Sequence, residues 1–127
     1  MQKNPTYDNV IDEVLEFFIR KIPEVRQTGI SDIIIDLGFG FGKTVENNYQ
    51  LLRQLSEFKI ISAPILAGIS RKSMIYKALD IQADEALNGT TALHMVALQQ
   101  GAKILRVHDV KEAMEVISLF GRVENSN

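Results

Sequence analysis

Apolar residues recur along the chain in two patterns, one typical of helices and one typical of buried strands. Helical spacing predicts a first helix over residues 6–22, which follows Pro5 and ends near Pro23 and Gly29. Short apolar runs predict three strands, over residues 33–36, 64–69 and 103–107. The first of these is a continuous β-branched run, which favours a strand buried on both faces.

Helical patterns follow each predicted strand. They cover residues 45–55, 74–79, 90–100 and 110–120, with a further turn or short helix at 83–88. Asp109 is expected to be the N-cap of the last helix, and the tail from Gly121 is expected to be frayed. One helix followed by three strand–helix units predicts an α/β fold with a parallel sheet and right-handed crossovers.

Glycine-rich or polar segments directly follow the three predicted strands: DLGFGFGKT, GISRKS and RVHD. The carboxyl ends of parallel strands carry the active sites of α/β folds. The candidate functional residues therefore lie in these segments.

The segment after the first strand resembles a phosphate-binding loop but fits neither standard pattern. Leu37 stands where the Walker A motif needs its first glycine, and Lys43 stands where a dinucleotide fingerprint needs its third. One interpretation is a tight strand-to-helix turn with Lys43 and Thr44 near the helix start. The other adds a ligand role for Asp36, which ends the strand.

The second segment places Ser70 and Lys72 two positions apart, so they would face the same way if strand geometry continued. In the alternative interpretation, Ser70 or Ser73 is a helix N-cap and Arg71 and Lys72 are a solvated pair. No partner for a hydrolase triad is evident for Ser70, and no G-x-S-x-G elbow surrounds it.

In the third segment, Arg106 and His108 would share a strand face and suit an anion such as phosphate or diphosphate. A surface edge strand is the alternative. His94 lies within a predicted helix, where a packed or half-exposed side chain is expected, and two histidines without a carboxylate cluster predict no metal site. Together, Asp36, Lys72, Arg106 and His108, with Phe41 as an aromatic wall, predict one pocket.

Composition narrows the classes of function. The 127 residues suit a single domain, and the 14 Lys and Arg against 16 Asp and Glu leave a net charge of −2. Nucleic acid and anionic membranes are therefore not expected as partners. The chain has no cysteine, which fits a cytoplasmic location, and no apolar run is long enough for a membrane span.

The chain resembles the dihydropteroate synthase family, whose fold is a (β/α)8 barrel. Three hallmark segments occur in order, as DLGFGFGKT, GISRKS and RVHDV, together with NGTTALHMVALQQGAKI. The resemblance covers nearly the whole chain, with Leu37 in place of the usual proline. It implies that residues 1–127 are the C-terminal half of the barrel, with the last three strand–helix units preceded by a helix. Truncation, proteolysis or a shortened gene model would give such a fragment.

The resemblance implies condensation of 4-aminobenzoate with a dihydropterin diphosphate, which releases diphosphate. Catalytic roles would fall on Lys72, Arg106 and His108. Lys72 would donate to the pterin carbonyl edge, Arg106 would pack on the pterin ring and favour the phosphate side, and His108 would bind diphosphate. Mg²⁺ is the implied cofactor, with its protein ligand outside this chain.

Further substrate contacts are implied for four more positions. Asp36 would accept hydrogen bonds from the pterin ring nitrogens, while Phe41 and Ser70 would border the aminobenzoate. Val107 lies between the two cations and belongs to the same substrate-binding segment.

Two alternatives to a catalytic role remain, a non-catalytic pterin- or phosphate-binding module and a structural half-barrel. Three strands alone leave two sheet edges and an apolar face open. The chain is therefore expected to form a homo-oligomer or to associate with a missing N-terminal half, and to be inactive alone.

Overall fold

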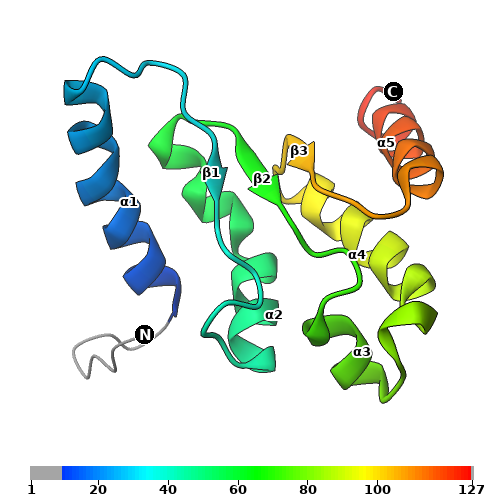
Figure 1. Cartoon of the computed structure of the whole chain (residues 1–127). Helices are drawn as coiled ribbons and strands as arrows, with labels where there is room; N and C mark the ends of the chain where they lie inside the picture. Colours follow the sequence, from blue (N-terminus) through cyan, green and yellow to red (C-terminus); the bar gives the residue numbers. More distant parts are fainter. Residues whose placement is uncertain (1–9, 127) are drawn as a thin grey trace.

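The structure, a computed structural model, describes residues 10–126. It is a three-stranded parallel sheet with the strand order β1-β2-β3, as the alternating pattern predicted. In Figure 1 the sheet runs through the middle of the molecule, α1 lies beyond β1 and α5 lies beyond β3. The elements in chain order are α1 (Val10–Gln27), β1 (Ile35–Asp36), α2 (Val45–Arg53), η1 (Leu55–Ile61), β2 (Ile65–Ala67), α3 (Ser73–Leu79), η2 (Ala83–Glu85), α4 (Leu87–Gln99), β3 (Ile104–Leu105) and α5 (Val110–Glu124).

The strand register brings the three carboxyl ends together. Ile35 pairs with Ile65, Leu66 pairs with Ile104, and Ala67 pairs with Leu105. The loops that follow β1, β2 and β3 therefore leave the sheet side by side. The three polar segments of the sequence are these loops.

The sheet packs on the helices through a core of buried side chains. Ile35, Ile65 and Ala67 are at most 2% exposed. Because alternate residues of a strand point to the same face, these side chains form the buried face of the sheet. The largest fully buried side chains in the described part are Phe39, Phe58, Ile11, Ile35, Leu51, Leu52, Leu55, Ile65, Ile69, Met74, Ile75 and His94.

The prediction that the first strand is buried on both faces was wrong. Ile35 is 1% exposed, but Ile34 is 56% exposed and Asp36 is exposed as well. The strand thus alternates, with one face against the core and the other face uncovered within residues 10–126. The β-branched run therefore indicates a strand, but it does not indicate that both faces of the strand are buried.

Several helix limits differ from the predicted ones. The part of the first helix expected at residues 6–9 lies outside the described residues, and α1 runs through Pro23 to Gln27. Pro23 is exposed, while Ile22 and Val25 on either side of it are half-buried, so packing holds the last turn despite the missing N–H.

Two other segments also depart from the prediction. The helix expected over 45–55 ends at Arg53, and a 3₁₀ segment follows because Leu55 and Phe58, both 0% exposed, turn into the core. The expected frayed tail is helical as far as Glu124, where the backbone N–H of Asn125 closes the helix on the carbonyl of Gly121. Likewise α4 begins at Leu87, three residues before the predicted start.

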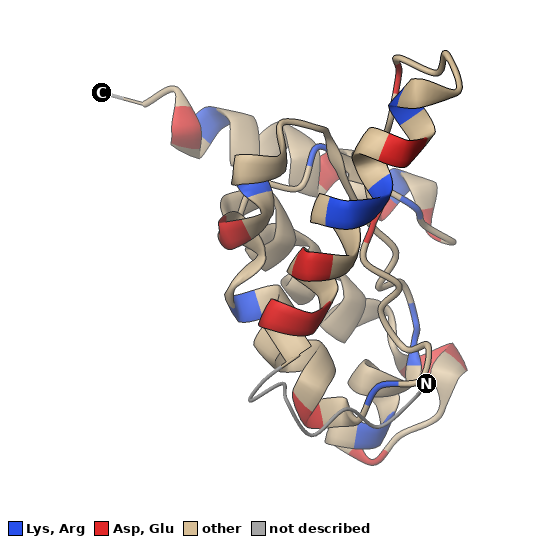
Figure 2. Cartoon of the chain, turned by 90° about the vertical axis from the view of Figure 1, so that its left-hand side faces the viewer, with Lys and Arg blue, Asp and Glu red and all other residues tan. Residues whose placement is uncertain are grey.

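Segments with positive and with negative side chains are interspersed over the ribbon in the view of Figure 2. Within residues 10–126 no helix has the length and apolar character that a membrane crossing requires.

Candidate functional site

The loop after β1 alternates glycines in left-handed backbone with aromatic residues. Gly38, Gly40 and Gly42 have φ values of 70°, 93° and 63°, a region that side chains rarely allow. Phe39 between them is 0% exposed, whereas Phe41 is 72% exposed. The glycines thus fold the loop so that one ring anchors it in the core and the other stands at the carboxyl end of the sheet, where the aromatic wall was predicted.

Lys43 closes this loop on itself. Its Nζ donates to the carbonyls of Gly38 (2.9 Å) and Phe41 (3.2 Å). Burial lowers the pKa of Lys43, and the charges of Glu13 and Asp36 oppose that shift. The Gly-Lys-Thr run is therefore a turn, as one interpretation held, and its ammonium bonds to the chain's own carbonyls.

Asn48 and Thr44 complete the turn from the helix side. The side-chain oxygen of Asn48 accepts the N–H of Gly40 (2.8 Å), and its amide donates to the carbonyl of Thr44 (2.9 Å). Thr44 is the N-cap of α2 and forms a capping box with Asn47. Asn48 is 1% exposed and was missed, since a single asparagine in a helical pattern gives no signal of a loop contact.

Asp36 and Arg106 form an ion pair across the open face of the sheet. The Arg106 guanidinium donates to the Asp36 carboxylate at 2.9 Å, and the Gly38 N–H donates to its other oxygen, also at 2.9 Å. Burial opposes the charge on Asp36. The hydrogen bonds from Gly38 and Arg106, and the charges of Arg106 and Lys72, outweigh it and lower the pKa of Asp36. The carboxylate is therefore ionised at neutral pH.

Lys72 joins this cluster from the loop after β2. Its Nζ donates to the carbonyl of Phe39 (2.8 Å) and lies 5.1 Å from the centre of the Phe41 ring. Burial and the charge of Arg106 lower the pKa of Lys72, and Asp36 opposes the shift. The structure thus brings Asp36, Phe41, Lys72 and Arg106 together, whereas His108, which was predicted for the same pocket, makes its hydrogen bonds with Ser70.

Gly68 makes room for Arg106 and was not singled out from the sequence. It follows β2 directly, and a side-chain carbon at this position would collide with the Arg106 guanidinium. The backbone N–H of Arg106 donates to the carbonyl of the neighbouring Ala67 (3.2 Å). A glycine directly after one strand and an arginine directly after the next are the only sequence signal for this contact.

Ser70 and His108 form a second pair beside the cluster. Ser70 Oγ lies 2.7 Å from His108 Nδ1, and the backbone N–H of His108 also donates to Ser70 Oγ (3.2 Å). Ser70 is 4% exposed, whereas His108 is exposed. The serine thus has a histidine partner that the sequence did not reveal. Its predicted place beside aminobenzoate stays a prediction.

The assumption that strand geometry carries Ser70 and Lys72 to the same side was wrong. The strand ends at Ala67, and Arg71 has a left-handed backbone with a φ of 54°. That turn separates the two side chains, so that Ser70 contacts His108 and Lys72 contacts the loop after β1. Neither serine caps α3, whose N-cap position is Lys72, without a side-chain hydrogen bond.

Arg71 and Asp109 connect the loops after β2 and β3. Arg71 Nε and a terminal nitrogen donate to the two Asp109 oxygens at 2.9 and 3.1 Å. Asp109 is the N-cap residue of α5, but its side chain makes no capping bond because the carboxylate is paired with Arg71. Arg71 is thus not the solvated cation that one interpretation expected, and the pairing could not be inferred from residues 38 positions apart.

Two further residues complete the list of predicted positions. Val107 is half-buried between Arg106 and His108. His94 is 2% exposed and its Nε2 has no hydrogen-bond partner, so it is the packed side chain that was expected. Burial lowers the pKa of His94, and the charge of Asp109 opposes the shift.

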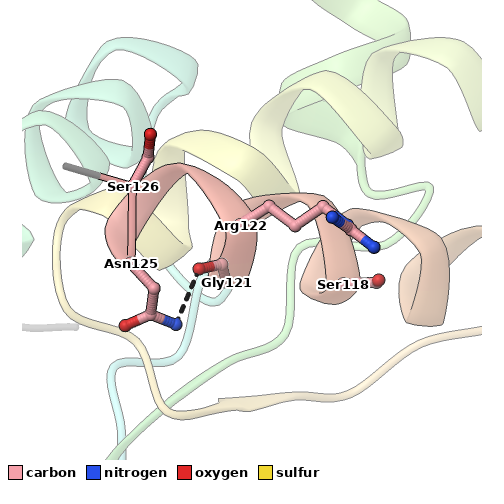
Figure 3. Close-up of a pocket in the computed structure, with 5 residues that line it drawn as sticks. All are labelled: Ser118, Gly121, Arg122, Asn125 and Ser126. Carbon is pink, nitrogen blue, oxygen red and sulfur yellow. Dashed lines mark hydrogen bonds between the residues drawn. The ribbon is translucent and has the colours of Figure 1, made fainter.

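The described residues do not by themselves form a metal site. Within residues 10–126 no group of three or more His, Asp or Glu side chains is arranged to hold an ion. Figure 3 shows a separate hollow on the C-terminal part of α5, where Asn125 donates to the carbonyl of Gly121 (2.8 Å). It is lined by Ser118, Gly121, Arg122, Asn125 and Ser126, none of which is a predicted site residue.

The chain is similar in sequence to known proteins over most of its length. Residues 1–108 match the family model described as pterin binding enzyme. The dihydropteroate synthase of Haemophilus influenzae is 46% identical over 99% of this chain and 46% of its own length. The corresponding Escherichia coli K12 enzyme is 46% identical over 92% of this chain and 42% of its own length. The chain thus spans about half the length of the curated relatives it matches.

Solved structures agree in fold. The Yersinia pestis dihydropteroate synthase in a sulfonamide drug complex superposes with a TM-score of 0.91 and 38% identity, over 99% of this chain and 47% of that one. The Xanthomonas albilineans enzyme in complex with 7,8-dihydropteroate gives a TM-score of 0.91 and 35% identity, over 100% of this chain and 51% of that one. On the family match and these similarities, the chain belongs to the family of pterin-binding enzymes.

Proposed function

We propose that this chain carries the pterin- and diphosphate-binding part of a dihydropteroate synthase site. The observation that carries the proposal is the cluster of Asp36, Lys72 and Arg106, which lies at the carboxyl ends of three parallel strands. The sequence and structural similarity to dihydropteroate synthases supports it. The proposed substrates are 4-aminobenzoate and a dihydropterin diphosphate.

The cluster suits a flat heterocycle that has both donors and acceptors. The ionised Asp36 carboxylate has acceptor capacity beyond its two present hydrogen bonds and would receive ring N–H groups. Lys72 would exchange its carbonyl contact at Phe39 for an acceptor on the ring. The planar Arg106 guanidinium lies over Gly68, where it would stack on the ring.

In the proposed reaction, the methylene carbon loses diphosphate and gains the amine nitrogen of aminobenzoate. The C–O bond breaks with its electron pair going to diphosphate, the C–N bond forms, and the amine gives up a proton. Arg106 and His108 would stabilise the leaving diphosphate, and Phe41 would flank the incoming aromatic amine. No side chain of the cluster needs to act as a covalent nucleophile.

Mg²⁺ is the expected cofactor. It would help diphosphate to leave, and its protein ligand is expected outside this chain. A cytoplasmic location and assembly with a second copy or a complementary half are parts of the same proposal. The chain has no cysteine, and its relatives are about twice as long.

Calorimetry tests the binding part of the proposal. We expect the pterin diphosphate to bind the 127-residue chain, and Lys72→Ala to weaken it at least about tenfold, which is ~1.4 kcal/mol. Lys103→Ala, at the opposite end of β3, is the matched control and should leave the affinity unchanged. Absence of binding would favour a structural half-barrel.

Turnover is tested in a chimaera in which this chain replaces the matching region of the Haemophilus influenzae relative. We expect activity from the chimaera, its loss with Arg106→Ala, and little activity from the chain alone. A chimaera that binds pterin diphosphate but forms no product would favour the non-catalytic binding module.

A further inference from the structure

The contact between Ser70 and His108 restricts where the imidazole carries its proton. The backbone N–H of His108 can only donate, so Ser70 Oγ accepts that bond (3.2 Å). Ser70 is 4% exposed, and the ring nitrogen Nδ1 at 2.7 Å is the remaining partner of its hydroxyl. If Nδ1 carried a proton, Ser70 Oγ could accept that bond as well, but its own hydroxyl hydrogen would then be buried without a partner, which is costly. This cost favours the arrangement in which the hydroxyl donates to an unprotonated Nδ1.

We infer that Ser70 is a positioning residue that selects the Nε2–H tautomer of the His108 imidazole. The second nitrogen is then an N–H donor on an exposed side chain, and it has no hydrogen-bond partner among residues 10–126. A neutral imidazole with the opposite tautomer would offer a lone pair there, which would repel an anionic oxygen.

Several contacts hold the conformation of the loop that carries Ser70. Arg71, the next residue, has a φ of 54°, a costly conformation for a residue with a side chain. Its backbone N–H donates to Thr90 Oγ1 (3.0 Å), and its guanidinium donates to Ala83 O (3.0 Å) as well as to Asp109. Asp109 follows His108 directly, so the ion pair sets the distance between the loops that carry Ser70 and His108.

This inference rests on the proposed function for the identity of the anion, which is the diphosphate of the substrate. The Nε2–H donor would bond to a diphosphate oxygen without needing a charged imidazole. Ser70 would then help to bind diphosphate by orienting the His108 ring, whether or not it also borders aminobenzoate.

Nitrogen-15 NMR of the histidine rings tests the tautomer directly. His94 is the only other histidine in the chain, so a His108→Gln variant assigns both rings. Spectra are recorded at a pH of about 8, above the range where model imidazoles titrate. We expect the Nε2–H tautomer for His108 in the unaltered chain. An Nδ1–H ring, or an equal mixture, would overturn the inference even if no variant could be studied.

Ser70→Ala should shift His108 toward a mixture of tautomers, and Ser73→Ala, which removes a hydroxyl three positions away, should not. An unchanged tautomer in Ser70→Ala would also overturn the role of Ser70. This readout needs no ligand, so it stands apart from the proposed function.

Titration with inorganic diphosphate then tests the ligand. We expect the Nε2 signal of His108 to move on binding, and the affinity to fall several-fold in Ser70→Ala but not in Ser73→Ala. If diphosphate does not bind the unaltered chain, the proposed function loses its support while the tautomer still decides the role of Ser70. Equal affinity in Ser70→Ala would show that the tautomer does not serve diphosphate binding.

Discussion

Arg71 donates two hydrogen bonds to the carboxylate of Asp109, at 2.9 and 3.1 Å, and so joins the loops after β2 and β3. Arg71→Lys would keep the charge but lose the two-point geometry of the guanidinium. We therefore expect Arg71→Lys and Asp109→Asn to lower the free energy of unfolding at pH 7, measured by urea titration. Glu115→Gln, in the exposed Lys111–Glu115 pair, is the control and should change little.

The ion pair between Arg71 and Asp109 also predicts that the stability of the fold depends on pH in the acid range. The hydrogen bond from Arg71 is the main cause that lowers the pKa of Asp109 below its ordinary 3.8. A lowered pKa means that the unfolded chain binds the proton more readily, so the stabilisation is present above about pH 4 and is lost as pH falls further. The stability difference between the unaltered chain and Asp109→Asn should shrink below pH 4. A constant difference down to pH 2 would contradict this.

Gly68→Ala should impair binding more than folding. The added carbon would displace the Arg106 guanidinium, which is half-exposed and can move aside. We expect a loss of at least about tenfold in affinity for pterin diphosphate, by calorimetry, with a small change in Tm. Gly121→Ala is the matched control, since its added carbon meets nothing within 4 Å and an alanine in α5 should add ~0.5–1 kcal/mol of stability.

Phe39 and Phe41 should behave oppositely although they lie two positions apart. Phe39 is 0% exposed, and Phe39→Ala should lower the free energy of unfolding by about 3–5 kcal/mol. Phe41 is 72% exposed, and Phe41→Ala should stay within about 0.5 kcal/mol while it removes the ring beside Lys72. Denaturant titration of both variants checks this. Equal losses in the free energy of unfolding would contradict the different roles of the buried Phe39 and the exposed Phe41.

His94 should make the fold sensitive to mild acid. Burial lowers its pKa, so the unfolded chain takes up a proton before the folded one does. Its contribution to stability is then present above about pH 6.5 and falls as pH decreases below that value. Urea titrations between pH 5 and 8 should show a shallower pH dependence for His94→Leu than for the unaltered chain. Identical slopes would contradict the burial argument.

The open face of the sheet should promote self-association of the chain. Ile34, at 56% exposed, lies on this face beside Asp36, and α5 adds exposed Met114 and Val110. Light scattering at micromolar concentration should give a mass above 14.3 kDa, and Ile34→Glu should lower it. A monodisperse monomer would disprove this expectation.

The sequence was sufficient to predict the parallel α/β order and the three loops that meet at the strand ends. Hydrophobic period and motif order are local properties, and they located Asp36, Phe41, Lys72 and Arg106 correctly at one edge of the sheet. The Ser70–His108 and Arg71–Asp109 contacts join residues 38 positions apart, and no local pattern encodes them. Gly68 was missed for the same reason, because its importance comes from the side chain of Arg106.

Helix limits were predicted less well because packing decided them. The 3₁₀ segment at Leu55–Ile61 exists since Leu55 and Phe58 must reach the core, and α5 continues past Phe120 because nothing in residues 121–124 interrupts the helix. Asp109 satisfied the residue preference for an N-cap, yet its carboxylate is used by Arg71. The preference for aspartate at helix starts identified Asp109 as the N-cap position, but it did not identify Arg71 as the partner of the carboxylate.

The ion pair between Asp36 and Arg106 spans 70 positions of the chain, and this has a kinetic consequence. Closing so long a loop costs conformational entropy, so we expect this contact to form after the local helices. During synthesis, the site does not exist until the segment with Arg106 has left the ribosome. A nascent chain that stops anywhere before β3 would contain Asp36 and Lys72 without the cation that pairs with Asp36.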